Sequence, residues 1–465
     1  MTVPPPDRLE RTDRIVAAHT PVRPPARHHL LALLGPAFVA AVAYVDPGNV
    51  AANITAGARY GYLLVWVLVV SNLMAVLIQY QSAKLGIVTG QSLPQVLGSR
   101  LGRPARLAFW LQAEVVAAAT DLAEILGGAI ALHLLTGMPL LAGGLVIGAV
   151  SMLVLAVQER HSQRGFEALI IALLVVITVG FMGGLVVSPP DWSATLGGLV
   201  PRLQGSDSLV VAASMLGATV MPHAIYLHSS LVRDHHQEVA AAGAGAEDDG
   251  ATDLPTPTGK AAATGGLGAV REPAPGPDVA RRTRLVRATR VDVVWALMLA
   301  GLVNIGLLLL AASALGGAHG TDTIEGAHAA ITASLGPAVG TVFAVGLLAS
   351  GLASTSVGAY AGSEIMAGLL HLRVPLLLRR AVTLIPALLI IASGAEPTWA
   401  LVVSQVVLSF GIPMAIIPLA RYTGSSQVMG RWRDGPLLRV VSVTVAALVV
   451  ALNACLVVLT LRGGL

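Results

Sequence analysis

Apolar segments long enough to cross a lipid bilayer recur from residue 30 almost to the end of the chain. A membrane-spanning helix needs about 20 predominantly apolar residues to cover a hydrocarbon core of about 30 Å. Inside that core every backbone N–H and C=O group must be paired within the protein, so such segments can fold only as helices. We identify eleven of them, over residues 30–56, 62–83, 107–134, 139–157, 166–188, 207–231, 293–315, 338–369, 374–394, 397–420 and 438–461.

Composition supports a membrane protein and excludes a soluble globular one. Of the 465 residues, 55% are hydrophobic and only 12% are charged, far from the average of soluble domains. Residues 1–29 are polar and rich in Pro and Arg, and the apolar run that follows is too long for a cleaved signal peptide. The sequence therefore predicts an all-α polytopic membrane protein with an N-terminal tail over residues 1–29.

Basic residues predict the orientation in the membrane. The N-terminal tail and the alternate loops, with which we count Lys84, Arg379 and Arg380, carry 26 of the 29 Lys and Arg residues. Because positive charge accumulates on the cytoplasmic side, we expect these segments and the N-terminus to be cytoplasmic. An odd number of spans then places the C-terminus outside the plasma membrane. The excess of basic residues is thus a topology signal, and we expect no nucleic-acid partner.

Residues 234–280 differ from the rest of the chain. They are rich in Ala, Gly and Pro, include the acidic run Glu247, Asp248 and Asp249, and contain almost no bulky apolar side chains. Such a segment cannot bury enough apolar surface to fold, so we predict a disordered cytoplasmic insert. It separates spans 1–6, within residues 30–233, from spans 7–11, within residues 281–465.

The first apolar segment contains a charge and a helix break, in the sequence AYVDPGNVAANI of residues 43–54. Placing the Asp46 carboxylate within a bilayer costs about 2.5–3.5 kcal/mol on insertion scales. Pro47 and Gly48 interrupt helical hydrogen bonding where no water replaces it. One interpretation is a cation site, formed by Asp46 and the backbone carbonyls that the break frees. The alternative is that Asp46 only caps the broken helix.

A second break follows five spans later, in SMLGATVMPHAIYLHSSLV, where Met221 and His223 flank Pro222. Because five is an odd number, the two broken segments cross the membrane in opposite directions. Interrupted helices at matching positions of two halves indicate a transporter with its site at an inverted-repeat interface. We therefore predict two repeats, spans 1–5 and spans 6–10, with span 11 added after them.

The residue types at the breaks favour a transition metal ion. Asp46 and Asn49 offer oxygen ligands, which alone would suit Mg²⁺ or Ca²⁺. Met221 adds a thioether sulfur, which favours softer ions, so Mn²⁺, Fe²⁺ or a neighbouring metal is the expected ligand. The alternative for Met221 is ordinary packing, since methionine commonly fills gaps in a core.

These motifs resemble those of the Nramp family of proton-coupled divalent metal transporters. The similar stretches are GPAFVAAVAYVDPGNVAANI, TDLAE and GATVMPHAIYLHSSLV, and the likeness runs from about residue 30 to residue 420 apart from the insert. The resemblance implies a LeuT-like fold and metal ligation by the side chains of Asp46, Asn49 and Met221. It also implies ligation by the backbone carbonyls of Ala43 and Ala218, and by Gln405 in outward-facing states.

Span 3 carries three acidic residues, Glu114, Asp121 and Glu124, on one stripe of a helix. They cannot all face lipid, and carboxyl groups in a poorly hydrated site can exchange protons near neutral pH. Arg379 and Arg380 of span 9 are expected either to pair with them or to anchor that span at the cytoplasmic surface. The resemblance implies that these five residues form a proton pathway.

Further polar groups and glycines occur within the spans. The resemblance gives His223 a role in proton coupling or gating, and histidine titrates in the physiological range. His228 is either a second proton relay or a hydrogen-bonded residue of the helix. We expect Asn304 to support a helix break by hydrogen bonding, and Gly351, Gly358 and Gly362 to be points of close helix packing.

The leading interpretation is a secondary transporter that imports Mn²⁺ or Fe²⁺ with protons by alternating access. The chain would then need no cofactor, would not be an enzyme and would function as a monomer. One alternative is a sodium-coupled symporter for organic solutes with the same fold. Another is a membrane receptor that senses metal without transport, although the chain has no segment that suggests a signalling domain. An intramembrane metalloenzyme is disfavoured because motifs such as HExxH are missing from the sequence.

Overall fold

The computed structural model describes residues 35–160, 163–248, 277–316, 320–321, 323–372 and 374–461, and its regular elements are helices. In chain order they are α1 (Pro36–Val42), η2 (Ala43–Val45), α2 (Pro47–Tyr60), α3 (Val65–Thr89), α4 (Leu93–Arg100), α5 (Arg103–Thr136), α6 (Leu140–Arg160), α7 (Gln163–Val187), α8 (Trp192–Gly197), α9 (Gly205–Thr219), α10 (Pro222–Asp248), α11 (Pro277–Ala314), α12 (Ile324–Leu335), α13 (Pro337–Leu370), α14 (Leu376–Ala392), α15 (Pro397–Thr423), α16 (Ser426–Met429), η3 (Gly430–Trp432) and α17 (Pro436–Leu461).

Each predicted apolar segment coincides with a helix or with a pair of helices separated by a break. Among the described residues, eight helical segments are long and apolar enough to cross a membrane: α3, α5, α7, α9 with α10, α11, α13, α15 and α17. The first, fourth and ninth predicted segments fall below that standard for different reasons. The first is interrupted at Asp46, α6 contributes a shorter apolar stretch, and α14 has only 17 residues. The total of eleven spans therefore remains a prediction.

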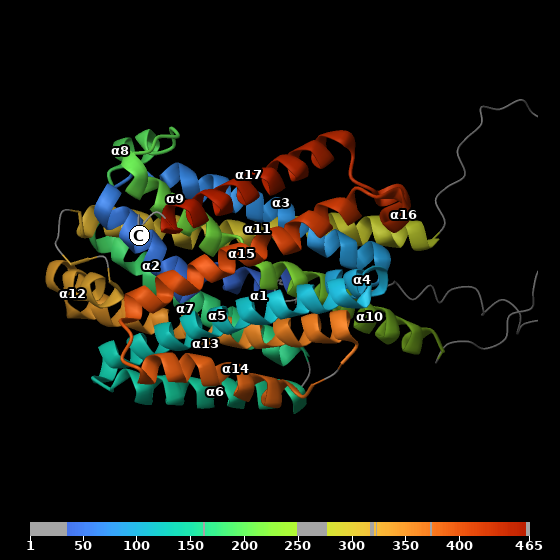
Figure 1. The fold of residues 1–465 in the computed structure, drawn as a ribbon, viewed down its shortest axis with the longest axis horizontal. Coiled ribbons are helices and arrows are strands. Elements are labelled where there is room, and N and C mark those ends of the chain that lie inside the picture. Colours follow the sequence, from blue (N-terminus) through green and yellow to red (C-terminus); the bar gives the residue numbers. More distant parts are fainter. Residues whose placement is uncertain are drawn as a thin grey trace, which may run out of the picture. The chain divides into compact units, whose positions relative to one another are not determined.

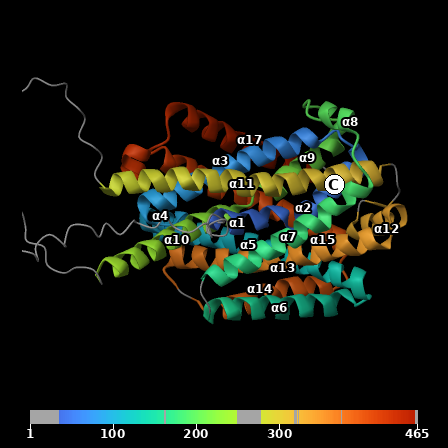
Figure 2. The same ribbon diagram turned by 180° about the vertical axis from the view of Figure 1, so that it is seen from behind.

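Both predicted breaks are present. The first separates η2 from α2 at Asp46, and the second separates α9 from α10 at Val220 and Met221. The chain runs in opposite directions through the two broken segments, with α2 beside α9 and α1 beside α10 (Figures 1 and 2). The local cause is proline, since Pro47 and Pro222 occupy the first positions of α2 and α10, where no backbone N–H is needed.

Small residues let neighbouring helices approach the breaks closely. A Cβ atom at Gly127 of α5 would overlap the ring of Pro47, and one at Gly57 of α2 would overlap the backbone of α11 at Leu308. The expected close contacts of α13 are confirmed: Gly351 packs against the backbone of α5, and Gly358 against the Glu124 side chain. The broken helix is thus enclosed by α5, α11 and α13.

The ends of the predicted insert differ from expectation. Helix α10 continues to Asp248 and α11 begins at Pro277, so residues 234–248 and 277–280 are helical. Residues 235–248 include the run VAAAGAGA, and alanine has the highest helix propensity, so a helix that is already nucleated in the bundle extends through it. Residues 249–276, the rest of the predicted insert, lie outside the described residues, as does the N-terminal tail.

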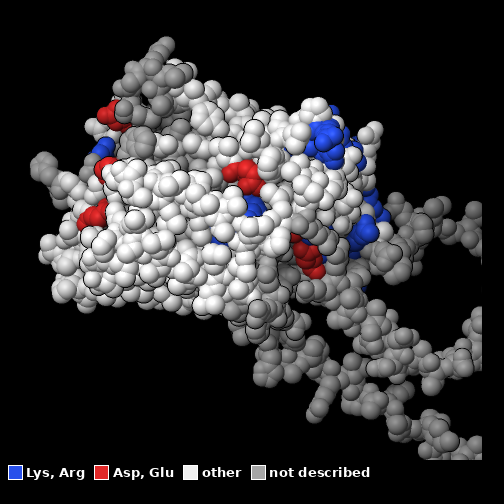
Figure 3. All heavy atoms as spheres, turned by 60° about the horizontal axis from the view of Figure 1, so that its bottom comes forward, with Lys and Arg blue, Asp and Glu red and all other residues white. Residues whose placement is uncertain are grey.

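Charged side chains are distributed unevenly. Figure 3 shows Lys and Arg concentrated at the end of the helices where Figure 1 labels α4 and α16. Three basic residues that we assigned to cytoplasmic loops are instead inside helices and buried: Lys84 in α3, and Arg379 and Arg380 in α14. Each of these side chains forms an ion pair, which offsets part of the cost of burying its charge. The pairs are Lys84 with Asp434, Arg379 with Glu114 and Arg380 with Asp121.

Candidate metal site

At the first break a carboxylate and backbone carbonyls lie outside regular helical hydrogen bonding. Asp46 has extended backbone angles and is the N-cap of α2, where its Oδ1 accepts a hydrogen bond of 2.9 Å from the backbone N–H of Asn49. The cap that we considered as an alternative role is therefore present. It uses only one carboxylate oxygen, because Oδ2 of this buried residue has no hydrogen-bond partner among the described residues.

The carbonyls freed at this break are held by side chains of other helices. Asn304 Nδ2 in α11 donates to the carbonyl oxygen of Tyr44 at 2.7 Å, which confirms its expected role in supporting the break. Ser350 in α13 donates to the carbonyl oxygen of Val45 at 2.5 Å, a contact that the sequence did not suggest. These bonds satisfy backbone groups that water cannot reach in a bilayer.

Asn49 connects the two breaks. Its Nδ2 donates to Asp46 Oδ1 at 2.6 Å and to the carbonyl oxygen of Ala218, in the last turn of α9, at 2.9 Å. A single donor atom thus lies between a carboxylate and a carbonyl that come from different halves of the chain. The predicted ligands Asp46, Asn49 and Ala218 therefore converge at one place, where the amide N–H₂ lies between two acceptors.

Gln405 of α15 lies beside this group. Its side chain is buried, and neither amide atom has a hydrogen-bond partner among the described residues. A Cβ atom at Gly48 would overlap Gln405 Nε2 and would lie 3.1 Å from Asp46 Oδ2. Gln405 and Asp46 therefore flank the same glycine, although they are far apart in the sequence. An unpaired buried polar group costs about 1–3 kcal/mol, and a bound ion would remove that cost for both.

The two remaining predicted ligands, Ala43 and Met221, are at the breaks among apolar side chains. Ala43 begins η2 and Met221 is between α9 and α10, and both belong to the same fully buried cluster of side chains. Within the described residues, no group of three or more His, Cys, Asp and Glu side chains comes together in a way that could hold a metal. A site here thus combines one carboxylate with neutral oxygen and sulfur ligands.

The three acids of α5 differ in their surroundings. Arg379 donates to Glu114 Oε2 at 2.9 Å, and Arg380 forms an ion pair with Asp121. The expected pairing of these arginines is confirmed, and the alternative of surface anchoring is wrong for Arg380, whose side chain is fully buried. Glu124, also fully buried, has no hydrogen-bond partner for either carboxylate oxygen among the described residues.

Glu124 and His223 lie close to the breaks. Glu124 is one turn before Gly127, which packs on Pro47, and a Cβ atom at Gly358 would lie 3.3 Å from its Oε2. His223 is in the first turn of α10, and neither ring nitrogen has a hydrogen-bond partner in the described part of the chain. Both are therefore buried titratable groups near the breaks whose polar atoms have no hydrogen-bond partner among the described residues.

His228 belongs to a hydrogen-bonded row that sequence analysis missed. Its Nδ1 lies 2.8 Å from Gln79 Oε1, and Gln79 Nε2 donates to the Tyr44 hydroxyl at 2.7 Å. Of the two roles that we considered for His228, hydrogen bonding within the helix bundle is observed. The row links α10 and α3 to η2, so the 3-10 segment before Asp46 is held from two sides.

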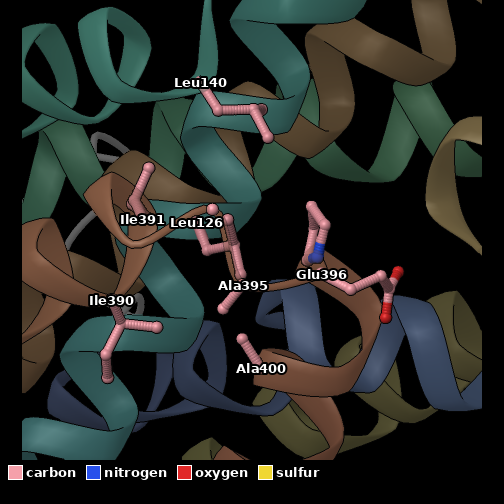
Figure 4. Close-up of a pocket in the computed structure, with 9 residues that line it drawn as sticks. Leu126, Leu140, Ile390, Ile391, Ala395, Glu396 and Ala400 are labelled. Atoms are coloured by element: carbon pink, nitrogen blue, oxygen red, sulfur yellow. The ribbon is translucent and has the colours of Figure 1, made fainter.

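A cavity of about 310 Å³ lies elsewhere, between α5, α6, α14 and α15. Leu126, Leu140, Ile390 and Ile391 line it, and Figure 4 shows their aliphatic side chains beside Ala395 and Ala400. The carboxylate of Glu396 is directed away from the group of aliphatic side chains in the same view. Apart from Glu396 the side chains of this lining are aliphatic, which suits an apolar group better than a divalent ion.

Comparisons with known proteins identify one family. The family described as "Natural resistance-associated macrophage protein-like" (Nramp) matches residues 37–459. A protein of Mycobacterium tuberculosis named divalent metal cation transporter MntH is 52% identical over 431 residues, covering 93% of this chain and 92% of the relative. A protein of Bacillus subtilis with the same name is 42% identical over 436 residues, covering 93% of each chain.

Solved structures agree with this match. A crystal structure of a mutant manganese transporter from Eremococcus coleocola superposes with a TM-score of 0.77 at 29% identity, covering 92% of this chain and 87% of that one. MhsT, a structure with the LeuT-like fold, matches with a TM-score of 0.53 at 15% identity, covering 90% and 98%. At that identity the likeness concerns the fold alone, and it confirms the predicted LeuT-like architecture.

Proposed function

Because the chain belongs to the Nramp family, we propose that it imports Mn²⁺ and Fe²⁺ across the cell membrane by alternating access, coupled to protons. The relatives named above are a divalent metal cation transporter and a manganese transporter, which supports the substrate class. The chain is a multi-pass membrane protein, and its clustered basic residues support a cytoplasmic N-terminus. We further propose that a single copy suffices for transport, with no bound cofactor.

One observation carries this proposal: the two helix breaks meet at Asp46. The carboxylate, the Asn49 amide and the Ala218 carbonyl are joined by hydrogen bonds of 2.6 and 2.9 Å, while Asp46 Oδ2 and the Gln405 amide are buried and have no hydrogen-bond partner in the part of the chain that the structure describes. Rotation of the Asn49 amide by half a turn would present its oxygen to an ion at the same place. We propose Asp46, Asn49, Met221, Ala43 and Ala218 as the metal ligands, with Gln405 approaching in the outward-facing state.

The proton pathway is proposed to follow α5 away from the metal. Glu124 is next to the break and has no ion-pair partner among the described residues, whereas Asp121 and Glu114 are paired with Arg380 and Arg379. A proton that leaves Glu124 would pass along α5 to Asp121 Oδ2 and then Glu114 Oε1, the carboxylate oxygens of these pairs that have no hydrogen-bond partner among the described residues. His223, beside the proposed ligand Met221, is the second exchange site of this proposal.

The proposal is tested by uptake into liposomes that contain the purified protein. Mn²⁺, Fe²⁺, Mg²⁺ and Ca²⁺ are compared under an inward proton gradient, with sodium replaced by potassium in a parallel set. We expect uptake of Mn²⁺ and Fe²⁺, acidification of the vesicle interior and no dependence on sodium. A sodium requirement, or uptake of an organic solute without uptake of metal, would instead favour the sodium-coupled symporter.

Replacement of Met221 by alanine is expected to change ion selectivity more than Mn²⁺ uptake. Mn²⁺ is a comparatively hard ion, and the remaining oxygen ligands also suit Ca²⁺ and Mg²⁺. We expect Met221→Ala to retain Mn²⁺ uptake, to bind Cd²⁺ more weakly and to admit competition by Ca²⁺. The measurement is Mn²⁺ uptake with Ca²⁺ or Mg²⁺ as competitor at concentrations in the millimolar range.

Met215→Ala is the matched control, because Met215 is also fully buried but belongs to the middle of α9. Like Met221→Ala, this substitution removes one buried thioether and leaves a similar cavity, but it does not change a residue of the break. If Met221→Ala excludes Ca²⁺ as well as the parent and Met215→Ala do, selectivity does not depend on this sulfur.

Replacement of Glu124 by glutamine is expected to separate proton movement from metal binding. The side chain keeps its shape and its contact with Gly358 but can no longer exchange a proton. We expect Mn²⁺ binding by calorimetry to survive, while the acidification that accompanies uptake falls by about tenfold or more. Glu325→Gln, in the first turn of α12, is the control for loss of a carboxylate. Loss of Mn²⁺ binding in Glu124→Gln would show that this residue serves the metal site as well as the proton pathway.

A further inference from the structure

At the end of the helices where basic residues gather, two exposed arginines flank a tryptophan and two more exposed arginines follow it in the chain. Arg282 is near the start of α11, Arg431 and Trp432 belong to η3, Arg433 follows directly and Arg439 is in the first turn of α17. We call these five residues the Trp432 surface. They come from two segments of the chain that are about 150 residues apart, so the fold and not the local sequence brings them together.

The tryptophan is flanked by two cations. The guanidinium carbon of Arg282 is 6.0 Å from the centre of the Trp432 ring, and that of Arg431 is 5.7 Å from it. Arg282 also donates to the carbonyl oxygen of Val88, in the last turn of α3, at 3.1 Å. The positions of the two guanidinium groups are therefore set by contacts to the ring and to a neighbouring helix.

The segment that carries Trp432 is fixed to α3 by a buried network. Asp434 accepts hydrogen bonds of 2.8 Å from both Lys84 Nζ and Gln81 Nε2, and its backbone N–H donates to the Thr423 carbonyl at 3.0 Å. Asp434 is the acidic residue between Arg421 and Arg439, and its side chain is only 1% exposed. Because Lys84 neutralises it, this carboxylate does not cancel the positive charge of the surface.

An exposed apolar face adjoins the Trp432 surface. The exposed aliphatic face of α17 begins immediately beside it, with Leu437 78% and Val440 63% exposed. In a membrane-spanning helix such side chains contact acyl chains, whereas tryptophan concentrates at the interface and arginine extends its charged group to the headgroup layer. Positive charge and an exposed apolar surface are thus next to each other, as the headgroup and acyl chains of a lipid require.

We propose that the Trp432 surface is a binding site for an anionic phospholipid, whose phosphate contacts the guanidinium groups of Arg282 and Arg431 and whose acyl chains lie on α17. Guanidinium groups present planar pairs of N–H donors that fit phosphate oxygens. A zwitterionic lipid brings its own positive charge to the same place, so the anionic headgroup is the favoured ligand. Nothing in this proposal depends on which ion the protein transports.

The test measures thermal unfolding of the purified full chain in detergent micelles. Phosphatidylglycerol is titrated into a phosphatidylcholine background, and the rise of the unfolding temperature gives an apparent affinity. Since each arginine near anionic lipid contributes about fivefold in binding, Arg282→Gln/Arg431→Gln is expected to weaken phosphatidylglycerol binding by about ten- to thirtyfold. Trp432→Leu is expected to weaken it less, because the phosphate contacts remain.

Arg103→Gln/Arg106→Gln is the matched control, since it removes two positive charges at the start of α5. If it weakens binding as much as the Arg282 and Arg431 pair does, attraction is general and the proposed site is wrong. Stabilisation of the parent by inorganic phosphate alone to the same extent would also overturn the lipid assignment. If the double variant does not fold, Arg431→Gln alone replaces it, because that side chain is exposed; an unchanged phosphatidylglycerol affinity in this variant would contradict the proposal.

Discussion

Replacement of Asp46 by asparagine is expected to abolish Mn²⁺ uptake while leaving the protein folded. Asparagine is as good an N-cap as aspartate, so its Oδ1 can still accept from the Asn49 backbone N–H and α2 keeps its first turn. The substitution removes the only formal charge among the proposed ligands. A divalent ion would then have to leave its water for neutral ligands alone, and uptake should fall by at least about a hundredfold.

Asp46→Ala separates the two roles of the residue. It removes both the charge and the cap, so Mn²⁺ uptake should be lost to the same extent. Loss of the cap should also lower the free energy of unfolding by about 1 kcal/mol, and with it the unfolding temperature. The readouts are Mn²⁺ uptake in liposomes and thermal unfolding in detergent. If Asp46→Asn transports like the parent and only Asp46→Ala fails, Asp46 is a structural cap and the proposed site is wrong.

Replacement of Arg380 by methionine is expected to give the largest loss of stability among single substitutions in α14. Arg380 is fully buried, forms an ion pair with Asp121 and donates from Nε to Ser151 Oγ at 3.2 Å. Without it the Asp121 carboxylate is left uncompensated in a region from which water is excluded. Breaking one partner of a buried pair costs about 3–5 kcal/mol.

The double variant Arg380→Met/Asp121→Leu checks this explanation. Replacing both partners by apolar groups of similar size removes the uncompensated charge, and stability is expected to return close to that of the parent. The unfolding temperature in detergent is compared for the parent, both single variants and the double variant. Equal losses in Arg380→Met and in the double variant would mean that packing of the arginine stem, and not its charge, holds α14 on α5.

The helix breaks could be predicted from the sequence because their causes are local. Each break has a proline at the first position of the following helix with polar residues beside it, so Asp46 and Pro222 identified both breaks, although Pro386, Pro413 and Pro418 lie inside α14 and α15 without ending them. The pairing of Arg379 and Arg380 with α5 also followed, since buried charges in a membrane need partners. The LeuT-like fold followed from the spacing of the breaks together with the family resemblance.

Contacts between distant segments could not be predicted in the same way. Neither the approach of Gln405 to Gly48 nor the bond between Asn49 and Ala218 has a local signal, because each depends on how the helices pack. Lys84 looked like a loop residue since its partner Asp434 is 350 residues later in the chain. The helical ends of the predicted insert were missed because low apolar content excludes a core but does not exclude a helix that continues from a buried one.

The most direct test of the proposed site is anomalous X-ray scattering from a crystal of the protein soaked with Mn²⁺. At the manganese edge, the account predicts one strong peak where the two helix breaks meet, within ligand distance of Asp46 and Asn49, between them and the carbonyl of Ala218. The same experiment with Asp46→Asn should show no peak there. A peak in the parent that lies away from Asp46, or one that persists unchanged in Asp46→Asn, would contradict the account.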